Sequence, residues 1–356
     1  MNKLYLYILG ISIVVGCNTK DKNVKEATRN QFNKVTIENI LLDSISIRAI
    51  NVSNEGLFYV GSQGKFGKII WDKGFKDFKT FKDTISYANR RPNFRAVSQN
   101  TSHYFLLSIE SPGLLYKMHK DSLVPKLVYK EEGEKVFYDA LTFIDSKNGL
   151  AIGDPTDSCM SVISTKDGGN TWSKVSCSNL PKVGEGEAAF AASNGNIAYS
   201  KNKIWFVSGG VVSKVYISDD GGKNWSSKEL PILQGSPTTG AYAVDFYNEN
   251  IGIAYGGDYT KPEENTKNVV KTLDGGQTWG SIANDANNGY KSAVQFIPGG
   301  RGKEIVAVGF TGISLSNNGG DTWKSISDES FYTIRFLNDS IAFAAGKNRI
   351  AKLTFM

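Results

Sequence analysis

Three arginines occur at related positions of short apolar segments, and guanidinium groups bind carboxylates and phosphates through paired hydrogen bonds. Arg48 and Arg95 each begin such a segment, whereas Arg335 ends a segment that begins at Tyr332. If these segments are neighbouring strands, the three arginines and Tyr332 form one positive arc. Such an arc would bind a carboxylate, a phosphate or an acidic peptide.

A structural role is the alternative for the same arginines. Asp139 and Glu187 are the acidic residues that we expect beside the arc, and Asp245 lies three positions into its own apolar segment. These carboxylates would either complete a ligand site or pair with the arginines as braces between strands. The residue types do not decide between binding and bracing, so both interpretations stay open at this point.

Metal and nucleophile chemistry are poorly represented in the chain. The sequence has only two histidines, His103 and His119, so we do not expect a multi-histidine zinc site. Neither a G-x-S-x-G elbow nor a Walker loop occurs. The formal net charge of +6 is spread along the chain rather than gathered in a basic stripe, so we expect no nucleic-acid partner. We also expect no metal and no cofactor.

Four copies of one turn indicate which elements position these side chains. Each copy has the pattern Ser/Thr-x-Asp/Asn-Gly-Gly-x-Thr/Asn-Trp, and the copies lie roughly 50 residues apart, as in propellers and solenoids. In such a turn Asp and Ser/Thr bond the backbone, Gly takes positive φ and Trp packs between neighbouring sheets. The residues with this structural role are Asp167, Trp172, Asp220, Trp225, Asp274, Trp279, Asn318 and Trp323.

An apolar strand recurs upstream of these turns and gives the number of units. Aligned first strands begin at Arg48, Arg95, Asp139, Ala188, Tyr242, Ser292 and Tyr332. The last unit is short, and residues 34–42 precede the first unit without a unit of their own. We expect that segment to complete the last blade and close the ring, which removes exposed sheet edges. The prediction is an all-β, seven-bladed β-propeller over residues 34–356.

The repeat resembles a known family of propellers. Residues 143–153 followed by the turn at 165–172 resemble the photosystem II stability/assembly-factor family, which carries Asp-box (BNR) repeats, and similar units recur further along. The resemblance implies a non-catalytic scaffold that binds or assembles other proteins. Asp-boxes also occur in sialidases and other propellers, so they specify the fold better than the function.

A glycan-acting protein is the second hypothesis, because sialidases combine Asp-boxes with an arginine triad, a Tyr nucleophile and carboxylates. The residues that would supply the last two are Tyr332, Tyr242, Glu185 and Asp139. The Arg-Ile-Pro segment of those enzymes is missing from the first unit, and those enzymes are six-bladed. Glycoside hydrolysis also needs two carboxylates about 5–10 Å apart, which a sequence does not measure.

The N-terminal segment resembles a lipoprotein signal. An apolar run ends at Val14-Val15-Gly16-Cys17, which resembles a bacterial lipobox with Cys17 as the lipidated residue. An ordinary secretory signal is the alternative. We therefore expect a signal peptide at residues 1–16, a flexible tether at 17–33 and the propeller at 34–356. The expected location is the bacterial cell envelope, at the outer membrane or surface.

The remaining cysteines, Cys159 and Cys177, flank the first repeated turn. In a hairpin closed at that turn they would lie opposite each other, and an exported protein meets an oxidising environment, so a disulfide is expected. Two free thiols offset by a register slip are the alternative.

The expected partner is an envelope or surface protein, or an anionic ligand at the mouth of the central channel. The membrane would be reached only through the lipid at Cys17. We expect the protein to be a monomer.

Overall fold

The computed structural model describes residues 31–356, and this part of the chain is built almost wholly from strands. The proposed signal peptide, Cys17 and most of the expected tether lie outside the described residues. Within the described residues no helix is long and apolar enough to cross a membrane.

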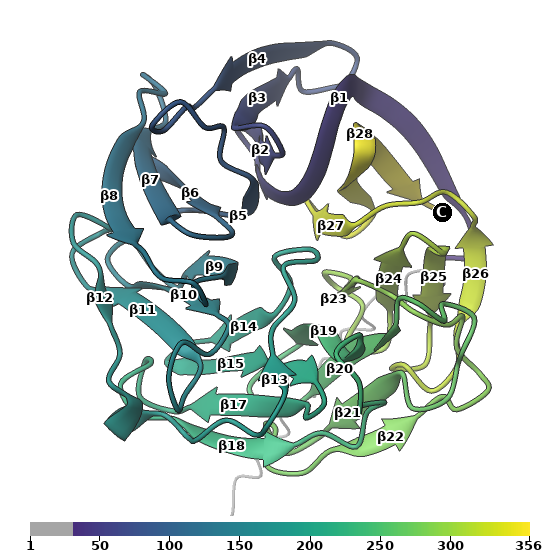
Figure 1. Ribbon diagram of the computed structural model, residues 1–356. Coiled ribbons are helices and arrows are strands. Elements are labelled where there is room, and N and C mark those ends of the chain that lie inside the picture. Colours follow the sequence, from purple (N-terminus) through teal and green to yellow (C-terminus); the bar gives the residue numbers. More distant parts are fainter. Residues whose placement is uncertain (1–30) are drawn as a thin grey trace, which may run out of the picture. The chain divides into compact units, whose positions relative to one another are not determined.

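The strands form hydrogen-bonded sheets arranged around a ring (Figure 1). The first sheet contains β1 (Val35–Ser53), β2 (Gly56–Gly61), β3 (Lys65–Trp71), β4 (Phe78–Thr84), β27 (Thr333–Phe336) and β28 (Ile341–Phe355). The second contains β5 (Phe94–Gln99), β6 (His103–Ser108), β7 (Gly113–His119) and β8 (Lys126–Glu131). The third contains β9 (Tyr138–Phe143), β10 (Gly149–Gly153), β11 (Ser161–Thr165) and β12 (Ser173–Lys174).

Three further sheets complete the ring. The fourth contains β14 (Ile197–Ser200), β15 (Lys203–Val207), β17 (Lys214–Ser218) and β18 (Ser226–Glu229). The fifth contains β13 (Glu187–Ala188), β16 (Gly209–Gly210), β19 (Thr239–Phe246), β20 (Gly252–Asp258), β21 (Val269–Thr272) and β22 (Gly280–Ile282). The sixth contains β23 (Ala293–Phe296), β24 (Ile305–Gly309), β25 (Gly312–Ser316) and β26 (Lys324–Ser327). The predicted all-β propeller is confirmed.

The predicted number of blades needs correction, because the described residues form six sheets rather than seven. The cause is β1, a single strand of 19 residues that pairs with β28 through its first part and with β2 through its last part. The first and last units of the sequence repeat therefore share one continuous six-stranded sheet.

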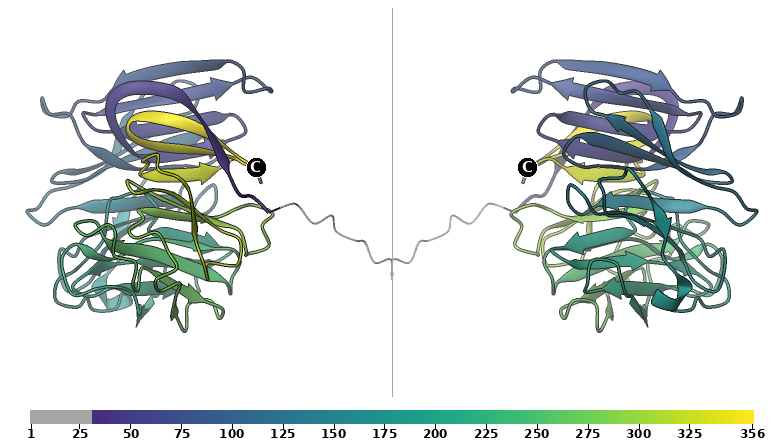
Figure 2. Two further views of the ribbon diagram at one scale, coloured as in Figure 1. Left: turned by 90° about the vertical axis from the view of Figure 1, so that its right-hand side faces the viewer. Right: turned by 90° about the vertical axis from the view of Figure 1, so that its left-hand side faces the viewer.

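The N-terminal part of β1 closes the ring as expected. Its pairs with β28 run from Val35 opposite Phe355 to Ser46 opposite Lys347. Figure 2 shows the two strands, purple and yellow, side by side when the ring is viewed from the side. The pairing covers the edge that β28 would otherwise expose to solvent.

The four repeated turns lie in the outer hairpins, between β11 and β12 and at the three equivalent places. In the second copy Asp220 Oδ1 accepts hydrogen bonds from the amides of Lys223 and Asn224, both at 3.0 Å. Trp225 is buried and its Nε1 donates to the Gly222 carbonyl at 3.2 Å. Three of the four tryptophans are 8–9% exposed, which fits their predicted structural role, and Trp279 is half-buried.

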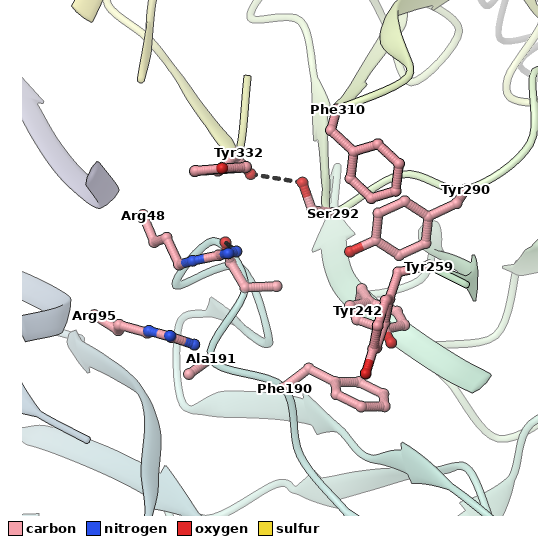
Figure 3. Close-up of a pocket in the computed structure, with 11 residues that line it drawn as sticks. Arg48, Arg95, Phe190, Ala191, Tyr242, Tyr259, Tyr290, Ser292, Phe310 and Tyr332 are labelled. Atoms are coloured by element: carbon pink, nitrogen blue, oxygen red, sulfur yellow. Dashed lines mark hydrogen bonds between the residues drawn. The ribbon is translucent and has the colours of Figure 1, made fainter. Parts of the chain in front are cut away.

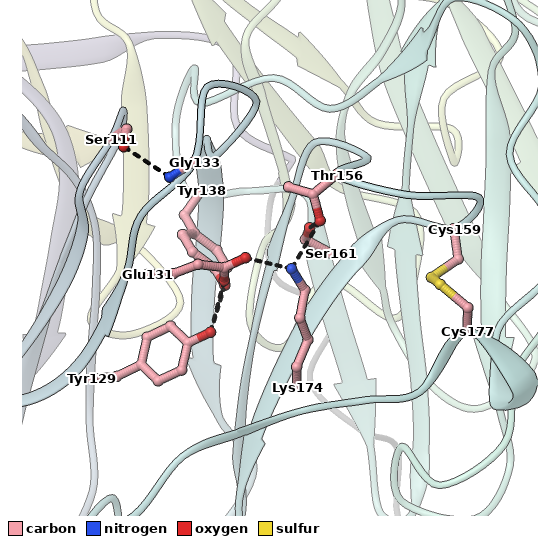
Figure 4. A network of polar contacts seen from close by, with 10 residues as sticks. All are labelled: Ser111, Tyr129, Glu131, Gly133, Tyr138, Thr156, Cys159, Ser161, Lys174 and Cys177. Atoms are coloured by element: carbon pink, nitrogen blue, oxygen red, sulfur yellow. Dashed lines mark hydrogen bonds and ion pairs between the residues drawn. A yellow bond between two sulfur atoms is a disulfide. The ribbon is translucent and has the colours of Figure 1, made fainter.

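Polar contacts and a disulfide fasten the outer part of the third sheet (Figure 4). Glu131 of β8 accepts hydrogen bonds from Tyr129 at 2.7 Å and Tyr138 at 2.5 Å, and it pairs with Lys174 of β12 at 2.5 Å. Cys159 and Cys177 form a disulfide with a Cα–Cα distance of 5.5 Å. Cys177 begins the short 3-10 helix η1 (Cys177–Asn179) rather than lying in a strand.

The first strand of the fourth unit differs from the sequence alignment. The alignment placed it at Ala188, but the strand next to β15 is β14. Ala188 lies in β13, which pairs with β16. Residues 190–196, which we call the plug, belong to the connection from β13 to β14 and reach the middle of the ring (Figure 1).

Candidate functional site

A pocket of about 270 Å³ lies where the inner strands begin. Its lining combines two arginines with a group of aromatic rings (Figure 3). The lining residues are Arg48, Arg95, Phe190, Ala191, Ala192, Tyr242, Tyr259, Tyr290, Ser292, Phe310 and Tyr332. Ala191 and Ala192 belong to the plug, so the plug forms one wall of the pocket.

Arg48 and Arg95 supply the positive charge of the pocket. Arg48 lies in β1, where its Nη1 donates to the Ala192 carbonyl at 3.3 Å and its guanidinium lies 4.2 Å from the centre of the Tyr332 ring. Arg95 lies in β5, and burial together with the nearby charge of Arg48 lowers the pKa of its guanidinium. An anion that enters between two neighbouring positive charges offsets their electrostatic repulsion.

The opposite side of the pocket is a wall of aromatic rings (Figure 3). Phe190 stacks on Tyr242 with ring centres 3.9 Å apart, and Tyr290 meets Tyr242 edge-on at 4.8 Å. Tyr259 and Phe310 extend the wall and are 47% and 40% exposed. Large exposed aromatic residues beside arginines are typical of protein-binding hot spots.

Arg335 does not join the other two arginines, so the expected arc of three is corrected to a pair. It lines a second cavity, three residues further along the inner strands. Its Nη1 donates to the Ile334 carbonyl at 2.7 Å, and its Nη2 donates to the Asn194 carbonyl at 2.7 Å. Burial lowers the pKa of Arg335 to about 10, and the charge of Asp245 opposes that shift. These hydrogen bonds connect the strand of Arg335 with the plug, as a brace would.

The plug is held by side chains from several strands. Ser193 carbonyl accepts a hydrogen bond from Thr333 Oγ1 at 2.9 Å. The Asn194 side chain accepts from the Leu141 amide and donates to the Val97 carbonyl, both at 2.8 Å. The plug thus separates the arginine pocket from the cavity that Arg335 lines.

The acidic candidates do not line the arginine pocket, and its lining in the described chain contains no Asp or Glu. Asp139 is fully buried, and burial with the nearby carboxylate of Asp154 raises its pKa well above the usual range. Glu187 is enclosed, with Lys214 at 2.7 Å and the Tyr216 hydroxyl at 2.6 Å. Glu187 therefore connects β13 with β17. Glu185 is exposed outside the pocket.

The structure does not bring together the residues expected for glycoside hydrolysis. Of its four candidates only Tyr332 and Tyr242 line the pocket. The Tyr242 hydroxyl donates to the Thr238 carbonyl at 2.7 Å, and burial raises its pKa above the usual range. The two carboxylates that glycoside hydrolysis uses are missing from the lining in residues 31–356.

Sequence reasoning missed most of the aromatic wall. Phe190 was assigned to a strand, whereas it begins the plug. Tyr259 lies in a loop insertion that follows β20, and an exposed tyrosine in such an insertion was the available signal. Tyr290 and Phe310 carry no local sequence signal. Among the described residues no group of three or more His, Cys, Asp and Glu is placed to hold a metal ion.

No protein-family model and no curated protein matches the chain. Among solved structures, YCF48 bound to D1 peptide is 14% identical over 92% of this chain and 96% of that chain, with a TM-score of 0.62. YCF48 from Cyanidioschyzon merolae is 13% identical over 91% and 98%, with a TM-score of 0.58. A GH74 enzyme from Niastella koreensis is 15% identical over 88% of this chain and 53% of that chain, with a TM-score of 0.58.

These likenesses show the fold alone, since one fold carries both peptide-bound and enzymatic examples. The class that the fold and the site define is an all-β propeller with an arginine–aromatic pocket at one end of its inner strands.

Proposed function

We propose that this protein is a non-catalytic scaffold that captures an anionic segment of a partner protein in the arginine–aromatic pocket. The observation that carries the proposal is the pairing of Arg48 and Arg95 in a pocket to which residues 31–356 contribute no carboxylate. A carboxylate there gains charge-assisted hydrogen bonds, and the aromatic wall gives apolar contact to the groups beside it.

The surroundings of the pocket support protein binding. Tyr259 and Phe310 extend apolar area to the rim of the pocket, where a partner chain would cover it. A propeller of the same fold is described as bound to a peptide. We further propose that the four repeated turns are Asp-boxes, as in the assembly-factor type of propeller, with a structural role.

The proposed location is the bacterial envelope, with the protein anchored as a monomer by lipid on Cys17. The test is Cys17→Ser, which should move the protein from the detergent phase to the aqueous phase. Equal partitioning of the variant and the wild type would contradict the anchor and would leave the pocket proposal intact.

The test of the pocket uses single substitutions in the full chain. Arg48→Ala and Arg95→Ala should each weaken capture of the partner by about tenfold or more, because each removes charged hydrogen bonds of roughly 1.5–3 kcal/mol. Capture by the wild type should weaken as salt rises. Arg91→Ala, at an exposed arginine outside the pocket, is the matched control. Equal capture by all four proteins, or binding that ignores salt, would overturn the proposal.

A further inference from the structure

The second cavity, on the other side of the plug, is built from one polar position of the sequence repeat. Its volume is about 270 Å³, near the lower limit of the roughly 300–1,000 Å³ of small-molecule sites. Inner strands all around the ring contribute one polar side chain each. These residues are Asn51, Ser98, Thr142, Tyr199, Asp245, Gln295 and Arg335.

Some of these side chains already fasten neighbouring strands together. Ser98 Oγ accepts from the Phe143 amide at 2.9 Å, and one Asp245 oxygen accepts from the Phe296 amide at 2.7 Å. Gln295 makes the equivalent contact through Oε1, which accepts from the Phe336 amide at 3.1 Å. Since these amides belong to the next inner strand, this part of the ring is structural.

Other polar atoms of the cavity have no partner in the described part of the chain. The Thr142 hydroxyl, the Tyr199 hydroxyl and Gln295 Nε2 form no hydrogen bond within residues 31–356, and Asn51 Oδ1 is buried without one. Donors and acceptors are therefore both available around one small space. Of these atoms Asn51 Oδ1 is the buried one, and a ligand that donates a hydrogen bond to it would remove the cost of leaving it unpaired.

The charges of the cavity balance, unlike those of the arginine pocket. Arg335 is the lining cation and Asp245 the lining anion, and each lowers the electrostatic cost of burying the other. The Arg335 guanidinium already donates hydrogen bonds to carbonyl groups of the plug and of its own strand. A ligand with a net charge of either sign would meet a lining group of the same sign.

One aromatic ring is placed at this cavity in an exposed position. Tyr199 of β14 is 45% exposed, although large aromatic residues usually bury more of their surface. An exposed ring beside unused donors and acceptors offers an apolar face to a ligand that is otherwise polar. Sugar rings and cyclic polyols have this combination of C–H faces and hydroxyl edges.

We propose that this cavity is a second binding site, for a neutral polyhydroxylated ligand of monosaccharide size that packs on Tyr199 and bonds the side chains of Thr142, Gln295 and Asn51. The site is separate from the arginine pocket, so the proposal does not depend on the proposed capture of a partner protein.

The test is saturation-transfer NMR on the full chain with methyl α-D-glucopyranoside, N-acetylglucosamine and myo-inositol as neutral probes. Acetate and tetramethylammonium serve as charged probes of each sign. At least one neutral probe should receive saturation, and its affinity should fall about tenfold in Tyr199→Ala combined with Thr142→Val. Neither side chain makes a hydrogen bond within residues 31–356, so this variant should keep the wild-type melting temperature.

Two controls sharpen the result. Tyr199→Phe should keep most of the binding because the ring remains, and Tyr247→Ala, at another exposed tyrosine outside the cavity, should leave the affinity unchanged. The proposal is overturned if no neutral probe binds, if acetate or tetramethylammonium binds more tightly, or if the double variant binds as the wild type does. If the double variant does not fold, the affinity of Tyr199→Ala alone for the neutral probe is judged by the same criteria.

Discussion

Arg335 and Asn194 are 141 positions apart in the chain, yet Nη2 of Arg335 donates a 2.7 Å hydrogen bond to the Asn194 carbonyl. The same guanidinium also donates to the Ile334 carbonyl. An arginine whose residue type suggested ligand binding is thus used to hold the plug in place. Arg48 of β1 and Arg95 of β5 keep the pocket on the other side of the plug positive.

The three arginines should therefore differ in their effect on stability. Arg335→Ala leaves the buried Asn194 carbonyl of the plug without its partner and removes the positive charge near Asp245, so it should lower the free energy of unfolding by about 3–5 kcal/mol. Arg95→Ala breaks no hydrogen bond of the described chain and should change the free energy of unfolding by less than about 1 kcal/mol. Urea unfolding measures this free energy for each variant, and a similar loss in the two variants would contradict the separate roles.

Acid should weaken the repeated turns. Hydrogen bonds from turn groups lower the pKa of Asp220 and of Asp274 to about 2. Because these folded values lie below the usual 3.8, the stabilisation is complete above pH 4 and is lost as the pH falls toward 2.

The measurement is the melting temperature from pH 5 to pH 2. Asp220→Asn together with Asp274→Asn should flatten its slope relative to the wild type. The fourth turn has Asn318 at this position, where Oδ1 accepts from the Thr322 amide at 3.0 Å, so an Asn is compatible with the turn. A slope that is the same in both proteins would show that the turns do not control the acid response.

The buried tryptophans of the turns should matter for stability and not for binding. Trp323 is 8% exposed and meets the Tyr255 ring at 5.2 Å, so Trp323→Ala should cost about 3–5 kcal/mol by leaving a cavity. Trp279 is half-buried, and its replacement should cost less. Thermal unfolding and partner capture, measured on the same samples, separate the two effects. Loss of capture by folded Trp323→Ala would contradict a structural role.

Removal of the N-terminal part of β1 should open the ring. A chain that starts at Ser44 lacks the partners of β28 from Phe355 to Arg349 and also loses Asp43, which pairs with Lys65 and Lys82. We expect a loss of several kcal/mol, a large share of the roughly 5–15 kcal/mol typical of a domain, and aggregation through the exposed edge. A truncated chain that melts like the full one would show that this pairing is dispensable.

The repeat predicted most of the fold, because strand and turn signals are local. The turns, their tryptophans and the pairing of residues 34–42 with the last unit all follow from short patterns of apolar, Gly and Asp residues. The number of sheets did not follow, since β1 reads as two segments but forms one continuous strand. Continuity of a strand depends on its neighbours in space rather than on its own residues.

The site was predicted only in part for a related reason. Arg48, Arg95 and Tyr332 meet as the alignment of strands implied. The plug interrupts that alignment in the fourth unit, so Phe190 was placed in a strand and Arg335 in the wrong cavity. An inserted segment that satisfies polar groups of distant strands has no periodic signal, and its path is decided by tertiary hydrogen bonds.

The pairing of β1 with β28 also bears on how the chain is made. Thr36 and Thr354 lie directly opposite each other, although 318 positions separate them. At a translation rate of about 5–20 residues per second, the earlier strand waits on the order of tens of seconds for its partner. Throughout that interval residues 35–46 of the nascent chain lack their strand partner, although the later part of β1 can already pair with β2.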